Sequence, residues 1–309
     1  MVGMGDLPGS PTLNSLAEAA SNNGVIVGTG AFDTALQQAF RWTESEGMVG
    51  LGVLPGMARS QGRAVSYDGS IVVGDSGPAS SYDSGSVPFR WSAATGMISL
   101  GVPAGFVAAR GNGVSADGSV IVGDGSILPF GSGAWRWTEA GGFVNLGNLG
   151  GAFPFTRAMG LSGDGRVVVG NGYGPNGFEA FLWTAEGGMV GLGDLPGGTF
   201  SSWANGAVNY DGSIIVGGSQ SGEYASDAFI WDATHGMRSL KHVLEDEFGL
   251  DLTGWNLEEA QGLSADGLTI SGWGYNPLGQ REAWVAHIPE PATIGLLLFG
   301  ALGTVARRR

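Results

Sequence analysis

Cysteine is absent from the 309-residue chain, and lysine occurs only once, as Lys241. The lack of cysteine excludes disulfides, thiolate metal sites and cysteine nucleophiles. Lysine and arginine together number 14 against 28 acidic residues, which gives a formal net charge of −14. Because binding to phosphates requires basic side chains, this balance argues against nucleic acid as a partner.

The N-terminal segment MVGMGDLPGS has neither a basic region nor an apolar run, so no signal peptide is visible in it. Glycine, in contrast, is abundant, with 59 residues, and it separates short runs rich in valine and isoleucine. Apolar residues make up 43% of the chain, and the chain contains 10 tryptophans, which is enough to build a packed core. This composition indicates many short strands joined by tight turns.

One acid–glycine step between two strand segments recurs six times, as in GVSADGSVIVGD from Gly113 to Asp124. The six copies are Asn23-Gly24, Asp68-Gly69, Asp117-Gly118, Asp164-Gly165, Asp211-Gly212 and Asp266-Gly267. An Asp-Gly pair there favours a tight turn in which glycine adopts a positive φ. Because Asn23 keeps the turn and discards the charge, we interpret the step as a structural turn rather than a metal ligand or catalytic acid.

An aromatic strand segment recurs with the turn, as in AFRWT from Ala39 and AWRWT from Ala134. A last copy, AWVAH, keeps its first aromatic residue but has Ala286 in the second position. The spacing between copies is 46 to 49 residues and lengthens to 55 at the end. We expect one aromatic anchor per repeat to pack between neighbouring units. These anchors are Trp42, Trp91, Trp137, Trp183, Trp231 and Trp284.

Each repeat contains four short apolar segments, which is the pattern of one blade of a β-propeller. Residues 1–288 are therefore predicted to form an all-β propeller of about six four-stranded blades. The first residues match the fourth strand and following loop at Met189, so we expect an N-terminal strand to close the last blade. A start within a repeat also fits a misassigned start codon, with a signal peptide and further strands upstream.

One insertion, residues 239–255, interrupts the repeats with the sequence SLKHVLEDEFGLDLTGW. Leu240, Val243, Leu244 and Phe248 have helical spacing, which predicts a short amphipathic helix. We expect this helix to cap one face of the ring; a gating or ligand-contacting role is the alternative.

The tail, residues 289–309, combines an uncharged apolar run at 292–306 with three final arginines, Arg307, Arg308 and Arg309. Such a run is short for a membrane span, and an ordinary buried helix is the alternative. Because the repeats are already complete, we predict a transmembrane helix whose basic end stays in the cytoplasm.

Pro289, Glu290 and Pro291, followed by the apolar run and the arginines, resemble the PEP-CTERM sorting signal. This resemblance implies an exported protein of a Gram-negative bacterium, tethered briefly to the inner membrane and processed by the transpeptidase-like protease exosortase. The repeats also resemble the HAF family of extracellular bacterial repeats, through the triplets QAF, EAF and DAF. That second resemblance implies a location outside the cell rather than an activity.

No motif for catalysis or metal binding accompanies these features. His235 and His242 flank the predicted helix near Glu245, Asp246 and Glu247, but neither they nor His287 form an HExxH spacing. No GxSxG segment is present. Three acidic residues that follow strands could supply paired carboxylates for glycan chemistry or ligands for Ca²⁺: Asp75, Asp124 and Asp194. Three tryptophans outside the aromatic strand could contact a ligand: Trp203, Trp255 and Trp273.

We therefore predict a non-catalytic structural or interaction protein of the cell surface or extracellular matrix, with no cofactor and with exopolysaccharide as the expected partner. One alternative is a glycan-active enzyme or lectin that uses the central funnel of the propeller. A second alternative is a surface protein that its tail anchors permanently in the membrane.

Overall fold

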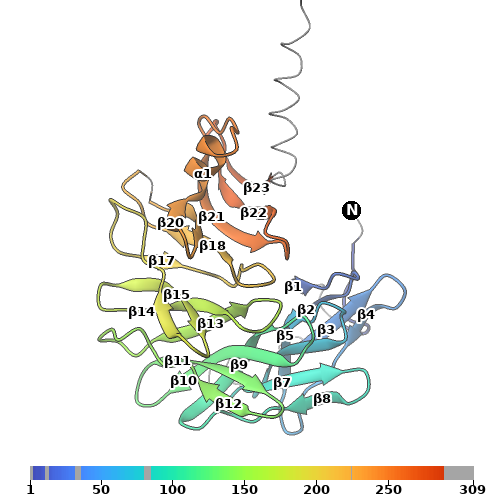
Figure 1. The fold of residues 1–309 in the computed structure, drawn as a ribbon. Coiled ribbons are helices and arrows are strands. Elements are labelled where there is room, and N and C mark those ends of the chain that lie inside the picture. Colours follow the sequence, from blue (N-terminus) through green and yellow to red (C-terminus); the bar gives the residue numbers. More distant parts are fainter. Residues whose placement is uncertain (1–2, 11–13, 32–35, 80–84, 224, 289–309) are drawn as a thin grey trace, which may run out of the picture.

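The computed structural model describes residues 3–10, 14–31, 36–79, 85–223 and 225–288, and these residues form an all-β fold as predicted. Six antiparallel sheets follow one another along the chain, five with four strands and the last with three (Figure 1). The sheets are sheet 1, β1 (Ser15–Ala20), β2 (Ile26–Ala31), β3 (Gln37–Thr43) and β4 (Gly47–Gly50); sheet 2, β5 (Arg59–Val65), β6 (Ile71–Gly77), β7 (Val87–Ser92) and β8 (Gly96–Ser99); sheet 3, β9 (Phe106–Val114), β10 (Val120–Ile127), β11 (Ser132–Thr138) and β12 (Gly142–Asn145); sheet 4, β13 (Thr156–Leu161), β14 (Val168–Tyr173), β15 (Phe178–Thr184) and β16 (Gly188–Gly191); sheet 5, β17 (Ser202–Trp203), β18 (Ile214–Ser219), β19 (Asp227–Asp232) and β20 (Gly236–Ser239); and sheet 6, β21 (Asn256–Leu263), β22 (Thr269–Tyr275) and β23 (Arg281–His287).

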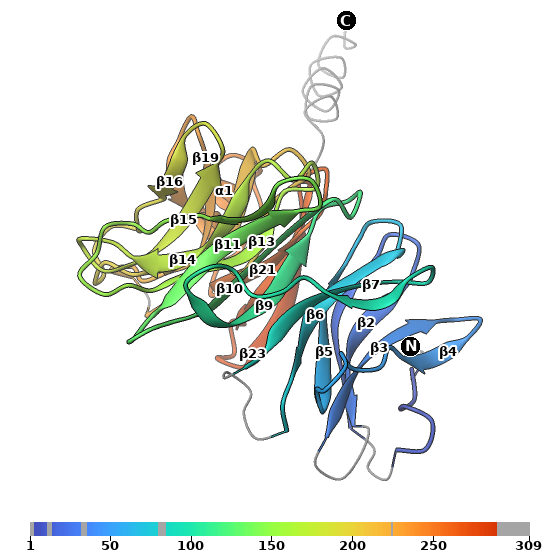
Figure 2. The same cartoon turned by 90° about the horizontal axis from the view of Figure 1, so that it is seen from below.

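Within each sheet the strands lie in chain order, so every sheet is an up-and-down meander. Figure 2 shows the sheets succeeding one another in space in the order of the chain. Residues from the first turn of all six sheets line one common cavity, which places the first strands around a central axis. We call this line the axis below.

The acid–glycine steps form the turns between the first and second strands. The glycine of each step has a φ between 71° and 82°, a left-handed conformation that glycine adopts without strain. In sheet 3, the Asp117 carboxylate accepts the Ser115 hydroxyl at 2.6 Å and the Ser119 amide at 3.0 Å. The aspartates of these turns therefore hold the backbone in place locally.

The hydrophobic core lies between consecutive sheets. Five clusters each combine buried residues of two neighbouring sheets, so sheets 1 to 5 are each covered by the next one along the chain. Between sheets 1 and 2, for example, Val27 packs with Val72 and Phe89. This arrangement is the mutual covering that the repeat pattern predicts.

The aromatic strand gives the core its largest side chains, but of the predicted anchors only Trp284 is one of them. The first aromatic residue of each copy is buried, whereas Trp42, Trp91, Trp137, Trp183 and Trp231 are only partly buried and pack at the margins of the clusters. The two aromatic residues are two positions apart, so their side chains lie on the same face of the strand. The tryptophan is the one nearer the C-terminal end of its strand. The buried rings are Phe40, Phe89, Trp135, Phe181, Phe229 and Trp284.

The single described helix, α1 (Leu240–Asp246), follows β20 directly and occupies only the first part of the predicted insertion 239–255. Leu240, Val243 and Leu244 are buried in the cluster between sheets 5 and 6. Phe248, beyond the end of the helix, packs against the same cluster. The helix thus covers the space between the last two sheets.

The predicted closure of the last sheet by an N-terminal strand is wrong for the described residues. Residues 3–10 form no strand, and sheet 6 has three strands. Met4 and Leu7 instead cover Phe40 of sheet 1. Leu7 lies against Gly30 as Leu149, in the linker from sheet 3, lies against the corresponding glycine of sheet 4. This segment therefore acts as a linker that caps sheet 1, while Met1 and Val2 lie outside the described residues.

The tail predictions fall on residues 289–309, which lie outside the described part of the chain. They include Pro289, Glu290, Pro291, the span 292–306 and the final arginines. Within the described ranges, no helix has the length and apolar character needed to cross a membrane.

Candidate functional site

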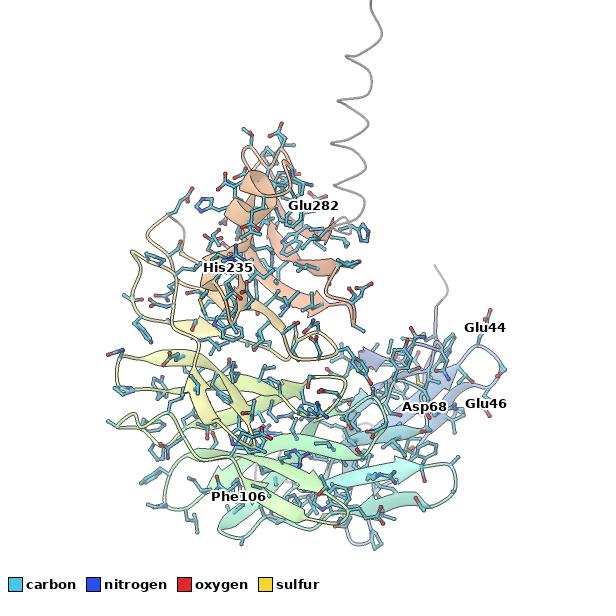
Figure 3. All side chains as sticks on the ribbon, in the orientation of Figure 1. Glu44, Glu46, Asp68, Phe106, His235 and Glu282 are labelled. Atoms are coloured by element: carbon cyan, nitrogen blue, oxygen red, sulfur yellow. The ribbon has the colours of Figure 1, made fainter. Side chains whose placement is uncertain are left out.

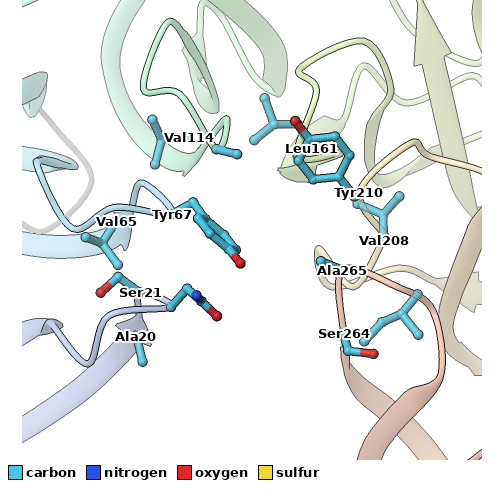
Figure 4. A pocket seen from close by; sticks show the side chains of 14 residues that line it. Ala20, Ser21, Val65, Tyr67, Val114, Leu161, Val208, Tyr210, Ser264 and Ala265 are labelled. Carbon is cyan, nitrogen blue, oxygen red and sulfur yellow. The ribbon is translucent and has the colours of Figure 1, made fainter.

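The first candidate site is the cavity at the end of the axis where the β-turns gather (Figure 4). It has a volume of about 570 Å³, and turn or strand residues of all six sheets line it. Tyr67 of sheet 2 and Tyr210 of sheet 5 point into it, and about half of each side chain is exposed, 51% and 49%. The other lining side chains are small or neutral, and none is a carboxylate.

Backbone hydrogen bonds between successive turns form the rim of this cavity. The Asn22 amide donates to the Tyr67 carbonyl at 3.1 Å, and the Tyr67 amide donates to the Ala116 carbonyl at 3.1 Å. The series continues through Gly163 and Tyr210 to Ala265 of sheet 6. No corresponding bond joins Ala265 to Asn22 in the described chain. The rim is therefore linked at five of its junctions and open between sheets 6 and 1.

Arginines line the axis farther from this cavity, in sheets 2 to 4. Val65, Val114 and Leu161 line the cavity, and arginines stand two or four residues earlier on the same strands. The Arg63 Nε donates to Asp75 Oδ1 at 2.8 Å, and Arg59 pairs with the other oxygen of Asp75 at 3.3 Å. Asp75 is buried and faces two guanidinium groups.

The corresponding carboxylate of sheet 3 is arranged in the same way. Asp124 is buried, and it lies 3.4 Å from Arg110 Nε and 3.6 Å from Arg157 Nε of sheet 4. The Asn112 amide donates to Asp124 at 2.7 Å and to the Ala158 carbonyl at 2.9 Å. These contacts join sheets 3 and 4 across the axis side of their interface.

Glu259 has the equivalent central position between sheets 5 and 6. It is buried, and its two oxygens accept the indole N–H groups of Trp203 and Trp273, each at 3.0 Å. The Asn205 amide donates to Glu259 at 2.6 Å, and the Gln261 amide at 3.3 Å. Glu259 is thus surrounded by four donors, which suits a structural carboxylate better than a catalytic one.

The three carboxylates that the sequence suggested for glycan or Ca²⁺ chemistry do not converge. Asp75 and Asp124 face the axis but pair with arginines, and Asp194 lies in the linker after sheet 4. Burial raises the pKa of Asp194. Among the described residues, no group of three histidine or acidic side chains could hold a metal ion.

The histidines also lie apart from one another. His235 Nδ1 lies 3.0 Å from the Asp232 carboxylate, and His242 Nε2 lies 3.6 Å from the Glu223 carboxylate. His287 Nδ1 lies 3.1 Å from the Thr269 hydroxyl. Figure 3 shows His235 and Glu282 in the part formed by sheets 5 and 6, and Glu44, Glu46 and Asp68 in that of sheets 1 and 2. The three histidines therefore each have a separate partner and do not form one site.

Asp227 is a carboxyl group whose pKa is raised by its surroundings. It lies beside a second cavity, of about 290 Å³, together with Glu223, Arg238, Ser239 and His242. Burial raises its pKa to about 6, although a hydrogen bond from Ser239 acts in the opposite direction. A shifted carboxyl group in a pocket is a candidate for acid–base chemistry, but this one lies away from the axis and no second carboxyl group pairs with it by hydrogen bond.

The isolated tryptophans have different roles. Trp203, on the first strand of sheet 5, and Trp273, on the second strand of sheet 6, both donate to Glu259, and Arg281 stacks over the Trp273 ring at 3.9 Å. Trp255 packs against the cluster between sheets 5 and 6. The row of axial arginines was missed in the sequence. A possible signal was their place in RSQGRAV, FVAARGNGV and TRAMGL, just before three of the turns.

The comparisons with known proteins support the export signal and the fold. The family profile for the PEP-CTERM protein-sorting motif matches residues 287–309. The motif implies an exported protein sorted by exosortase. No curated protein sequence matches the chain. The resemblance of the repeats to the HAF family stays a prediction.

Several solved structures are similar to the chain. A protein assigned as TolB from Agrobacterium tumefaciens is 14% identical, with a TM-score of 0.51 over 89% of this chain and 91% of that one. The β-propeller domain of the Trilobed protease from Pyrococcus furiosus, which has an open velcro topology, is 10% identical, with a TM-score of 0.51 over 87% and 80%. A prolyl endopeptidase is 14% identical, with a TM-score of 0.59 over 88% of this chain and 41% of the enzyme. At these identities the likeness shows a β-propeller fold and no activity.

Proposed function

We propose that the chain is an exported β-propeller of the cell surface or extracellular matrix, which exosortase processes at its tail. It acts as a non-catalytic interaction module associated with exopolysaccharide. The observation that carries this proposal is the sorting motif at residues 287–309, which joins a repeat fold to an export signal. The propeller supplies a surface for binding, and the tail supplies the sorting signal.

The axial site supports a binding role over catalysis. Glycoside hydrolysis uses two carboxyl groups on either side of the scissile bond. The described carboxylates nearest this role, Asp75, Asp124 and Glu259, are buried and engaged by arginines, indoles or amides. The tyrosine-bearing cavity, in contrast, offers two half-exposed aromatic rings to a neutral ligand. This observation favours a lectin as the second candidate function.

Fractionation of cells with and without exosortase tests the proposal. We expect a shortened chain at the surface or in the medium when exosortase is present, and a full-length chain in the membrane fraction when it is absent. Replacing Pro289, Glu290 and Pro291 together by alanine should have the same effect as loss of exosortase. A full-length chain in the membrane under all conditions would instead indicate a permanent anchor, and a cytoplasmic chain would refute export.

Binding of neutral glycans tests the lectin candidate. The double variant Tyr67→Ala/Tyr210→Ala should lose binding at the cavity, because both rings face it (Figure 4). Tyr275→Ala is a matched control, because Tyr275 is exposed at the far end of β22. Equal binding by both variants would exclude this cavity as the site.

A further inference from the structure

An exposed group of aromatic rings lies on sheet 4, at the end opposite the cavity of Figure 4. We call Phe153, Phe155, Tyr173 and Phe178 the aromatic cluster. Tyr173 contacts the other three rings, with centroid distances of 5.8, 5.9 and 5.3 Å. Phe153 and Tyr173 remain 52% and 39% exposed. The cluster therefore presents aromatic surface to solvent instead of filling a core.

A neighbouring loop of sheet 3 extends this surface. The Ser132 amide donates to the Pro154 carbonyl at 3.0 Å, which joins the loop to the segment carrying Phe153. Phe130, two residues before Ser132, is 77% exposed. Exposed aromatic surface is typical of binding sites in monomeric proteins.

A positive charge lies directly beside the aromatic cluster. The Arg157 guanidinium stacks over the Phe155 ring, with its central carbon 4.7 Å from the ring centre. The Arg157 side chain is 42% exposed, while its buried Nε has no hydrogen-bond partner. The stacking fixes the plane of the guanidinium group and leaves its outer N–H groups available for a bidentate acceptor.

Arg157 shares the carboxylate that faces it with a second arginine. Asp124 is the carboxylate that faces it, at 3.6 Å, and the same carboxylate also faces Arg110 at 3.4 Å. Glu179, next to Phe178 on β15, accepts the Gly193 amide at 2.9 Å. Two guanidinium groups thus share one aspartate in a chain whose net charge is −14.

We propose that the aromatic cluster and Arg157 form a binding subsite for a carboxylate-bearing sugar, a uronate unit of an acidic polysaccharide. The apolar face of the sugar ring lies on Phe153 and Tyr173, and its carboxylate pairs with the guanidinium group of Arg157. Rings recognise the apolar face of the ligand and Arg157 its charge, so the subsite distinguishes uronates from neutral sugars. This inference rests on the proposed association with exopolysaccharide and specifies its ligand.

Binding of the full-length chain to polygalacturonate, with dextran as the neutral comparison, tests the proposal. We expect binding to polygalacturonate that weakens with added salt, and no binding to dextran at this subsite. Arg157→Gln should weaken the affinity about tenfold or more, because it removes a charged hydrogen-bonding partner. Phe153→Ala/Tyr173→Ala should weaken it as well. Arg157→Lys, which keeps the charge but not the planar fork, should recover only part of the affinity.

Arg166→Gln is the matched control, because this exposed arginine lies at the opposite end of sheet 4, beside Asp164. Its affinity for polygalacturonate should equal that of the unmodified chain. Circular dichroism establishes that each variant folds. Equal affinity of Arg157→Gln and the unmodified chain would overturn the inference, as would an equal loss in Arg166→Gln.

The native exopolysaccharide separates the two proposals. If it binds equally well to the unmodified chain and to Arg157→Gln, the inference fails and the proposed function stands. If neither it nor polygalacturonate binds, both fail. If the aromatic cluster captures a protein and no polysaccharide, the subsite is a protein interface and the inference is likewise overturned.

Discussion

At the scale of single residues, the turn aspartates combine a structural role with a clear electrostatic signature. Hydrogen bonds from Ser66 and Ser70 lower the pKa of Asp68 to about 2. The pKa values of Asp117 and Asp211 are lowered in the same way, mainly by Ser115 and Ser213. The charge stabilises a turn and needs no ligand to explain it.

These shifts predict a loss of stability in acid. A carboxyl group whose pKa is lower in the folded state contributes its stabilisation above its unfolded pKa and loses it as the pH falls through the folded value. We expect the melting temperature to fall between about pH 4 and pH 2. The triple variant Asp68→Asn/Asp117→Asn/Asp211→Asn should show a flatter profile in this range. An unchanged slope would contradict the assignment.

The pKa of Asp227 is shifted in the opposite direction, upward. Burial raises its pKa to about 6, so folding favours the neutral form. Its contribution is present below its unfolded pKa and is lost as the pH rises through about 6. Asp227→Asn should therefore stabilise the protein at pH 8, by on the order of 1 kcal/mol, and reduce the pH dependence of stability between about pH 4 and pH 6. Denaturant unfolding at several pH values measures this effect, and a destabilised variant at pH 8 would contradict it.

Turn residues could be predicted from the sequence, whereas the axial pairs could not. An Asp-Gly turn depends on neighbours within five residues, so the local sequence is sufficient to predict its structure. Arg157 and Asp124 are 33 positions apart and meet only because sheets 3 and 4 stack. The pairing partner of an axial arginine is determined by how the sheets stack around the axis and not by the local sequence.

At the scale of secondary-structure elements, the glycine that ends each valine-rich run has a specific steric role. A Cβ at Gly170 would overlap the Arg157 carbonyl oxygen and lie 3.0 Å from the Phe181 ring. In all six sheets the corresponding glycine faces the backbone carbonyl of an axis-side residue. These glycines are Gly28, Gly74, Gly123, Gly170, Gly217 and Gly272. The glycine lets the first strand and the buried ring approach the second strand together.

Gly170→Ala should therefore destabilise the protein by about 1–3 kcal/mol, the usual cost of overpacking. Chemical denaturation measures the change in unfolding free energy. Gly3→Ala is the control, because a Cβ at Gly3 meets no atom within 4 Å. Equal stability of Gly170→Ala and the unmodified chain would refute this role.

The aromatic strand shows which structural features the sequence pattern can predict and which it cannot. The repeat predicted the strand, because alternating aromatic residues bounded by glycine are typical of one. It did not predict which ring is central, since Phe40 and Trp42 share one face of β3. That choice depends on where the next sheet packs, which requires the tertiary structure.

At the scale of the whole molecule, sheet 6 differs from the other five because it has three strands instead of four. In sheet 5 the fourth strand pairs with β19, and Ile230 is 6% exposed; the equivalent Val285 of β23 is 72% exposed. The number of sheets could be predicted by counting repeats. The open junction could not, because the first residues have the sequence of a strand and linker, and only the linker is seen in residues 3–10.

Amide hydrogen exchange should show this difference. β15 pairs with strands on both sides, whereas β23 pairs with β22 alone in the described chain. We expect faster exchange in β23 than in β15, because fewer of its amides are hydrogen-bonded. Equal protection would mean that another strand covers the free edge of β23.

The central claim is that this exported propeller binds exopolysaccharide without degrading it. The most direct measurement is light scattering coupled to size-exclusion chromatography of the native polymer, incubated with the full-length chain. We predict that the chain elutes with the polymer and that the polymer keeps its molar mass. A progressive fall in that molar mass, or elution of all the protein apart from the polymer, would contradict the account.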